Sequence, residues 1–232
     1  MAVFPFEPVP LIIPSASNCL LWMRPDDTRS SNITSSAGRL SAIKNLANNR
    51  NLIRNTVTAN QPGTGVATIN GLNAISFDDD NNRWLTTGLP STMTDFTFFT
   101  VAQKGGSTTQ SVIMSQVRFT TNGSGFVSDD GTSAIGLVSG ASAVTAPAIF
   151  AITGNVATST RNLYKSSTTI GASGAYDGNI TPTFFGTLVA TSGSARGGFN
   201  MGETIMYNKV LSTAEITRII RYLANQWGVI LI

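Results

Sequence analysis

The chain has 232 residues, of which 41% are hydrophobic and only 12% are charged. This length suits one all-β domain or two very small domains, and the apolar content is enough for a core, which excludes global disorder. The chain has fifteen basic and twelve acidic residues. The basic residues are mostly unclustered, which argues against a nucleic-acid partner. The absence of histidine excludes imidazole catalysis and histidine-ligated metal.

Residues 1–17 form a proline-rich segment with apolar side chains between the prolines, notably Phe4, Phe6, Leu11 and Ile12. Proline removes backbone donors and favours extended backbone, so we expect an arm rather than a helix or a central strand. The arm has two interpretations: a strap over its own domain, or an assembly arm that buries its phenylalanines in a neighbouring subunit.

Nothing in the chain favours export or membrane insertion. The segment lacks the basic start of a signal peptide, and no stretch approaches the ~20 apolar residues that span a bilayer. Cys19 is the only cysteine, which excludes an internal disulfide, and we interpret it as a core residue. We therefore expect a protein made in the cytoplasm.

After residue 18 the pattern is that of an all-β domain. Short apolar runs alternate with turns rich in glycine, asparagine and serine, and a near-continuous apolar stretch at 95–103 indicates a strand covered on both faces. Residues 39–55 space their apolar side chains in a loosely helical way, which predicts a short helix or a long loop. Strands are expected near 18–23, 66–69, 74–77, 83–86, 96–103, 111–116, 118–121, 125–128, 134–138, 148–153, 161–165, 183–189 and 201–207.

One helix is predicted at 212–227. Ser212 and Glu215 form a capping box, and Gly228 ends the helix. An apolar stripe faces the sheet, formed by Ile216, Ile219, Ile220, Leu223 and Trp227. These elements together predict a two-sheet antiparallel jelly-roll sandwich with one C-terminal helix, a single domain over 18–232 preceded by the arm.

The order of these pieces resembles the concanavalin A-like lectin/glucanase superfamily, in its laminin-G-like version common in phage and bacterial genomes. The resemblance lies in Leu20–Asp26, Ile69–Asp78, Trp84–Leu85, Asp95–Ala102, Arg161–Lys165, Gly202–Glu215 and Tyr222–Gly228. It implies the jelly roll and, in general, glycan binding. The chain departs from the family in the basic segment 39–55 and at Ser166–Ser167, both at expected loops, so no ligand site is transferred.

The carboxylates argue against an enzyme. A glycosidase needs two carboxyl groups about 5 to 9.5 Å apart. Of three glutamates, Glu7 lies in the arm, Glu215 caps the helix, and the resemblance places Glu203 on the strand before it. The paired-acid strand of the superfamily's glucanases has no counterpart, so we expect no catalytic residue.

The acidic cluster at 78–82 has two interpretations. Asp78, Asp79 and Asp80 could supply oxygen ligands to calcium, or the stretch is an ordinary turn, since Asp and Asn bond to their own backbone. Beside it, Asn82, Arg83 and Trp84 are the candidate carbohydrate-binding residues. The other two tryptophans lie on apolar faces and are interpreted as core. No other cofactor is expected.

Two non-enzymatic functions compete. The first is a structural, decorating or adhesion protein of a virus particle, with a tailed phage favoured as the virus. It would assemble with itself or with other virion proteins through its arm, and it would expose a lectin-like sandwich toward host glycan. The second is a stand-alone carbohydrate-binding lectin module. A polysaccharide-cleaving enzyme is the third alternative. The arm favours the first, together with the low charge of a surface suited to repeated packing.

Overall fold

The protein is mostly β-structure with one C-terminal helix, which confirms the coarse prediction. The computed structural model describes residues 17–26, 33–48, 50–54, 61–77, 84–86, 88–89, 92–104, 111–114, 117–119, 125–129, 134–138, 146–176, 180, 184–186 and 198–232. Only the backbone is described for strands 50–54, 84–86, 111–114, 117–119, 125–129, 134–138 and 184–186.

The described strands pair antiparallel in two runs. The first run comprises β15 (Ala172–Ala175), β14 (Thr160–Lys165), β13 (Ala148–Asn155), β8 (Phe96–Lys104) and β17 (Phe199–Tyr207), then β1 (Cys19–Met23) and β6 (Leu72–Phe77) on the far edge of β17, and β5 (Gly63–Ile69) beside β6. The second comprises β12 (Ala134–Val138), β11 (Gly125–Asp129), β10 (Val117–Phe119), β9 (Ser111–Met114), β16 (Phe184–Gly186), β7 (Trp84–Thr86), β4 (Arg50–Arg54), β3 (Arg39–Asn45) and β2 (Ile33–Ser36). A pairing of Arg39 with Gly63 joins the runs.

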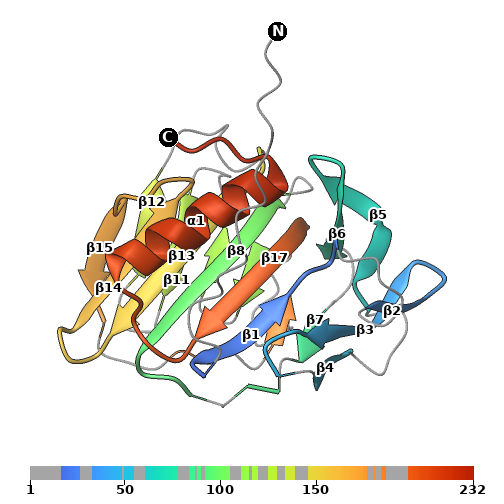
Figure 1. Ribbon diagram of the computed structural model, residues 1–232, viewed down its shortest axis with the longest axis horizontal. Coiled ribbons are helices and arrows are strands. Elements are labelled where there is room, and N and C mark those ends of the chain that lie inside the picture. The colour runs from blue at the N-terminus through green and yellow to red at the C-terminus, as the bar shows by residue number, and fades with distance from the viewer. Residues whose placement is uncertain are drawn as a thin grey trace, which may run out of the picture.

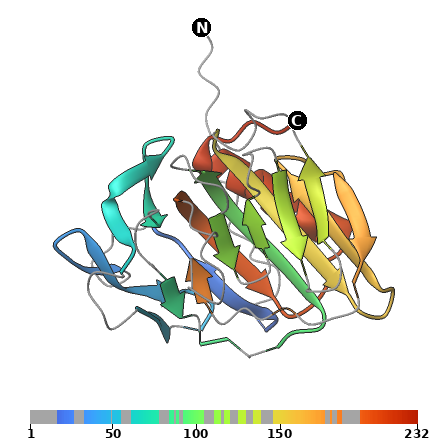
Figure 2. The same cartoon turned by 180° about the vertical axis from the view of Figure 1, so that it is seen from behind.

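Helix α1 (Thr213–Trp227) lies across the outer face of the first run (Figure 1), and the view from behind brings strands of the second run to the front (Figure 2). Two cores follow from this arrangement. Side chains of β8 alternate between them: Phe98 and Ala102 join the core on the face away from α1, whereas Phe99 and Val101 join the core beneath α1. The apolar stretch at 95–103 is therefore buried on both faces, as predicted.

The central strand β17 contains a bulge at Gly202 and Glu203. Met201 pairs with Ala102 and Thr204 with Thr100, so two residues of β17 face one residue of β8. A bulge shifts the side-chain alternation. Met201 accordingly faces the core away from α1, whereas residues 205 and 207 face α1. At the same place the far edge of β17 passes from β6 to β1.

The prediction of a helix or loop at 39–55 is wrong, because this segment forms β3 and β4. Thr34 pairs with Ala42 and Ser35 with Leu40, which leaves one extra residue in β3. The bulge places Leu40 and Ile43 in the same core although they are three residues apart. The spacing that resembled a helix is therefore produced by an irregular strand.

The sequence identifies α1 correctly. Ser212 Oγ accepts a hydrogen bond from the Glu215 backbone at 3.3 Å, and the Glu215 carboxylate accepts one from the Ser212 backbone at 2.8 Å. The helix ends at Gly228, whose φ of 62° is left-handed. The five residues of the predicted stripe are all buried, and the described part of the chain contains no helix long and apolar enough to cross a membrane.

Candidate functional site

The residues that the sequence analysis selected for binding fall mainly outside the described residues. Phe4, Phe6, Leu11 and Ile12 of the arm lie there, as do Asp78, Asp79, Asp80, Asn82 and Arg83. Trp84 begins β7, where only the backbone is described. The acidic segment connects the end of β6 in the first run with the start of β7 in the second. The calcium, carbohydrate and arm assignments stay predictions.

The described residues enclose a surface cleft elsewhere, with a volume of about 610 Å³. Its walls come from the turn after β1, from β2, and from the hairpin of β5 and β6. The lining residues are Asp26, Ile33, Ser35, Thr64, Gly65, Thr68, Gly71, Leu72 and Asn73. One carboxylate, one amide and several hydroxyl groups therefore lie around two aliphatic side chains.

The β5–β6 hairpin is held in place by its turn. Asn70 and Gly71 have φ values of 49° and 85°, and Ile69 pairs with Leu72, so they form the two-residue turn that an Asn-Gly pair favours. The Asn70 amide donates to the carbonyls of Trp227 and Gly228, at 2.8 and 3.1 Å. The hairpin that forms one wall of the cleft is thus tied to the end of α1.

Asn73 fixes the floor of the cleft. Its amide donates to the Pro25 carbonyl at 2.7 Å and to Thr64 Oγ1 at 3.2 Å, and its oxygen accepts from the Gly65 backbone at 2.8 Å. One side chain of β6 therefore holds both β5 and the turn that carries Asp26.

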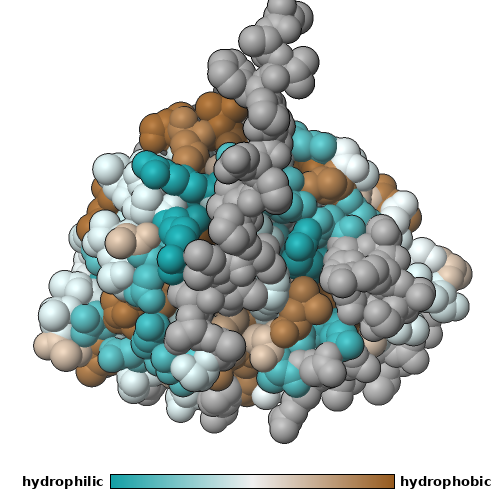
Figure 3. All heavy atoms as spheres, viewed as in Figure 1, coloured by the Kyte–Doolittle hydropathy of each residue, from teal (hydrophilic) through white to brown (hydrophobic). Residues whose placement is uncertain are grey.

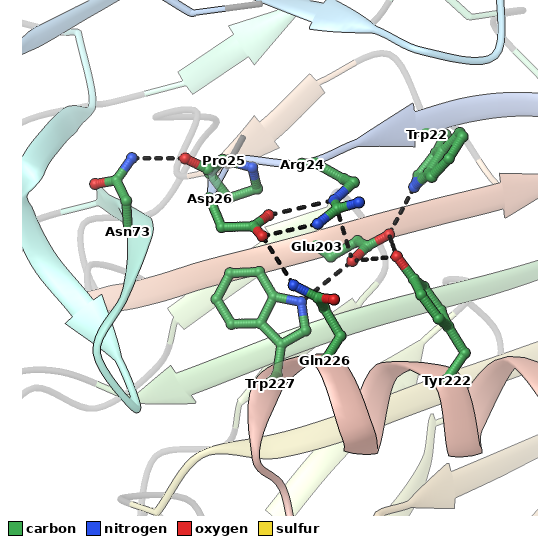
Figure 4. Close-up of polar contacts among 9 residues, drawn as sticks. All are labelled: Trp22, Arg24, Pro25, Asp26, Asn73, Glu203, Tyr222, Gln226 and Trp227. Atoms are coloured by element: carbon green, nitrogen blue, oxygen red, sulfur yellow. Dashed lines mark hydrogen bonds and ion pairs between the residues drawn. The ribbon is translucent and has the colours of Figure 1, made fainter. Parts of the chain in front are cut away.

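Asp26 is the carboxylate of the cleft, and its side chain is only 6% exposed. Arg24 donates to both of its oxygens, at 3.4 Å through Nε and 2.9 Å through Nη2. Gln226 of α1 donates to Oδ2 at 3.1 Å (Figure 4). The hydrogen bonds to Asp26 and the charge of Glu203 raise the pKa of Arg24 against the opposing effect of burial, so its guanidinium stays charged.

Behind Arg24 lies Glu203, which is fully buried. Its carboxylate accepts from Trp22 Nε1 at 2.6 Å, from the Tyr222 hydroxyl at 2.9 and 3.2 Å, and from Trp227 Nε1 at 3.2 Å. Arg24 Nε lies 3.8 Å from Oε2 (Figure 4). These partners are all donors, so they suit an ionised carboxylate.

Burial raises the pKa of Glu203 and outweighs the opposing effects of its donors and of Arg24. Burial and the adjacent carboxylate also raise the pKa of Tyr222, which keeps its hydroxyl protonated as a donor. A carboxylate enclosed by donors on every side can join strands and helix, but it has no access to a substrate. Glu203 is therefore a connecting residue between β17, β1 and α1.

The sequence analysis placed Glu203 on its strand and both buried tryptophans in the core, but it did not identify the cleft. A strand was expected near 18–23, but nothing in the local sequence pairs the turn after it, at Pro25 and Asp26, with Asn73 or Gln226. These contacts join segments 48 and 200 residues apart. Within the described residues, no group of three or more histidine, cysteine or acidic side chains could hold a metal ion.

Comparisons with known proteins give a fold and no family. No family model matches the chain, and no curated protein does. Among solved structures it is similar to the binding domain of Paraclostridial Mosquitocidal Protein 1, with a TM-score of 0.61, 11% identity, and coverage of 92% of this chain and 55% of that one. The binding domain of botulinum neurotoxin serotype G gives a TM-score of 0.59, 10% identity, and coverage of 91% and 54%.

A third similar structure comes from a study titled "Cell entry of botulinum neurotoxin type C is dependent upon interaction with two ganglioside molecules". It gives a TM-score of 0.60, 9% identity, and coverage of 90% of this chain and 52% of that one. The chain thus spans about half the length of these structures. At such low identity the similarity establishes the fold alone.

Proposed function

We propose that the protein is a non-enzymatic binding module that holds glycan in the cleft between β2 and the β5–β6 hairpin. The carrying observation is the lining of this cleft, where Asp26, Thr68 and Ser35 lie beside Ile33 and Leu72. Sugars present hydroxyl groups, which carboxylate and hydroxyl side chains bind, and C–H faces, which aliphatic side chains cover.

The fold supports this proposal. Two of the similar structures are described as binding domains, and the third comes from a study of interaction with two ganglioside molecules. The strand pairing, in two runs joined by one bridge, is what a concanavalin A-like jelly roll would give, and we propose that assignment for the chain. Against hydrolysis, Asp26 is the one carboxylate among the described residues that line the cleft, whereas a glycosidase needs two.

The experiment is a glycan array probed with the full chain, followed by affinity measurements on variants. Thr68 is exposed and lines the cleft. Thr68→Ala should weaken binding severalfold, because it removes one protein hydroxyl group that would bind the ligand. Thr158 is another exposed threonine, in the β13–β14 turn, and Thr158→Ala is the control. Equal affinities for both variants would overturn the assignment of the cleft.

We also propose that the module belongs to a virus particle, as an adhesion or decoration protein. Its support is the apolar arm and one patch of the described surface. Ile230 and Ile232 are 84% and 88% exposed, and Ile170 is 52% exposed. Figure 3 shows hydrophobic surface gathered where Figure 1 marks the C-terminus. Exposed apolar surface of this kind fits contact with another subunit.

Deleting residues 1–17 tests the assembly role separately from glycan binding. The deletion should abolish oligomerisation, measured by size-exclusion chromatography with light scattering, and incorporation into particles, measured by a mass-spectrometric inventory. Glycan affinity should be unchanged, because the cleft lies in the remaining residues. A deleted protein that assembles like the full chain would contradict the assembly role.

A further inference from the structure

We propose that Arg24 and Glu203 are positioning residues of the cleft: buried Glu203 orients Arg24, and Arg24 holds the Asp26 carboxylate where a ligand hydroxyl meets it. This inference rests on the proposed glycan-binding function of the cleft. It assigns a binding role to two residues that do not line the cleft themselves.

The first step is the position of Glu203. Its carboxylate is held by two indole N–H groups and a phenol from β1 and α1, all within 3.2 Å. The strand that carries it is bulged at this residue and paired on its other edge with β8. The Glu203 carboxylate is therefore fixed at one place beneath the end of α1.

The second step is the sharing of Arg24 between two carboxylates. Its Nε lies 3.8 Å from Glu203 and 3.4 Å from Asp26, while Nη2 lies 2.9 Å from Asp26 (Figure 4). The planar guanidinium can contact both partners at once, which a lysine ammonium cannot do in the same geometry. The Glu203 carboxylate therefore lies on one side of the guanidinium and Asp26 on the other.

The third step is the state of Asp26. Arg24 and Gln226 together provide three hydrogen bonds, and an ionised carboxylate has about four acceptor sites. Among the described residues these bonds occupy three of the acceptor sites, and under the proposal a ligand hydroxyl takes the fourth on the side that lines the cleft. Because the partners of Asp26 are donors, the carboxylate is held as an acceptor before any ligand arrives.

Two variants separate this role from a merely structural one. Arg24→Gln breaks the link to Asp26 but leaves the bonds from Trp22, Trp227 and Tyr222 to Glu203. Arg221→Gln is the matched control, since it makes the same substitution at an exposed position of α1 that does not line the cleft. Unfolding midpoints, Tm, report the stability of each variant.

The first readout needs no ligand. In nitrogen-15 NMR spectra of the full chain, Arg24→Gln should move the side-chain amide resonances of Gln226 and Asn73, which bond to Asp26 and Pro25. Arg221→Gln should leave both in place. Unmoved resonances in Arg24→Gln, or equal movement in Arg221→Gln, would overturn the inference.

The second readout is affinity for methyl glycosides of galactose, mannose and N-acetylglucosamine, with any sugar found on the array added. Arg24→Gln should weaken binding by about tenfold or more, and Glu203→Gln should do the same if it folds. Arg221→Gln should bind within about twofold of the wild type. An Arg24→Gln protein that binds as well as the wild type would refute the positioning role. If no sugar binds the wild type, the proposed function fails, and the amide resonances still decide whether Arg24 positions Asp26.

Discussion

The seam beneath α1, formed by Glu203 with Trp22, Tyr222 and Trp227, and the cleft beside it are built in opposite ways. In the seam, Glu203 and Trp227 are completely buried, and Trp22 contacts Glu203 from 181 residues away in the sequence. The cleft has walls of hairpins and turns, where Gly65, Thr68 and Gly71 are exposed. Stability is concentrated in the buried seam, whereas the proposed recognition depends on the exposed cleft. The two meet at Arg24.

The largest expected effect is in the seam. Glu203→Leu removes the acceptor of two buried indoles, a phenol and an arginine, so it should lower the free energy of unfolding by about 3–5 kcal/mol. Urea denaturation followed by tryptophan fluorescence measures this loss. A loss below about 1 kcal/mol would mean that these donors find other partners.

Next comes the packing of the bulge. A Cβ at Gly202 would lie 3.0 Å from two ring atoms of Trp227 and 3.1 Å from Val101. Gly202→Ala should therefore cost about 1–3 kcal/mol of stability and shift the emission of Trp227. Gly65→Ala in the cleft is the comparison, since a Cβ there meets no atom within 4 Å and any loss comes from its positive φ.

The helix cap should give a smaller effect. Ser212→Ala removes the side chain that accepts from the Glu215 backbone and should cost about 0.5–2 kcal/mol. Thermal unfolding by circular dichroism measures it. An equal loss in Thr217→Ala, which is part of the same helix but not of the cap, would show that the capping box is not the cause.

The two glutamates should respond to acid with opposite signs. Bonds from the Ser212 backbone and side chain lower the pKa of Glu215, so its contribution exists above its unfolded pKa and is lost as the pH falls through its folded pKa. Burial raises the pKa of Glu203, so the folded state takes up this proton first and its contribution grows as the pH falls. Unfolding measured against pH should show a smaller acid loss in Glu215→Gln than in the wild type. Equal losses would contradict the assignment.

The smallest stability change is expected in the cleft. Thr68→Ala should alter the free energy of unfolding by no more than about 0.5 kcal/mol, because its side chain is exposed, while glycan affinity falls. A Thr68→Ala protein that unfolds as easily as Glu203→Leu would remove the distinction between the two regions.

Elements that depend on residues close together in the sequence were predicted correctly. The capping box, the apolar stripe of α1 and the doubly buried β8 follow from short-range patterns, and the structure confirms each. Segment 39–55 was misread because a bulge at Ser41 gives a strand helical spacing. The weakly apolar β2 and β15 were not predicted, since they carry few side chains that mark a strand.

The cleft could not be predicted for a different reason. Its polar residues gain their arrangement from partners far along the chain, such as Gln226 for Asp26 and Pro25 for Asn73. An aspartate after a proline indicates a turn in any sequence. Only the folded structure shows that the turn at Pro25 and Asp26 meets Asn73 and Gln226.

The most direct test of glycan binding in the cleft is a nitrogen-15 NMR titration of the full chain with a glycan that binds it on the array. If glycan binds in the cleft, the backbone amide resonances of Gly65, Thr68, Gly71 and Asn73 should shift together and saturate. Those of residues on the outer face of α1 should stay in place. Shifts confined to residues outside the cleft, or no saturable shift with any retained glycan, would contradict it.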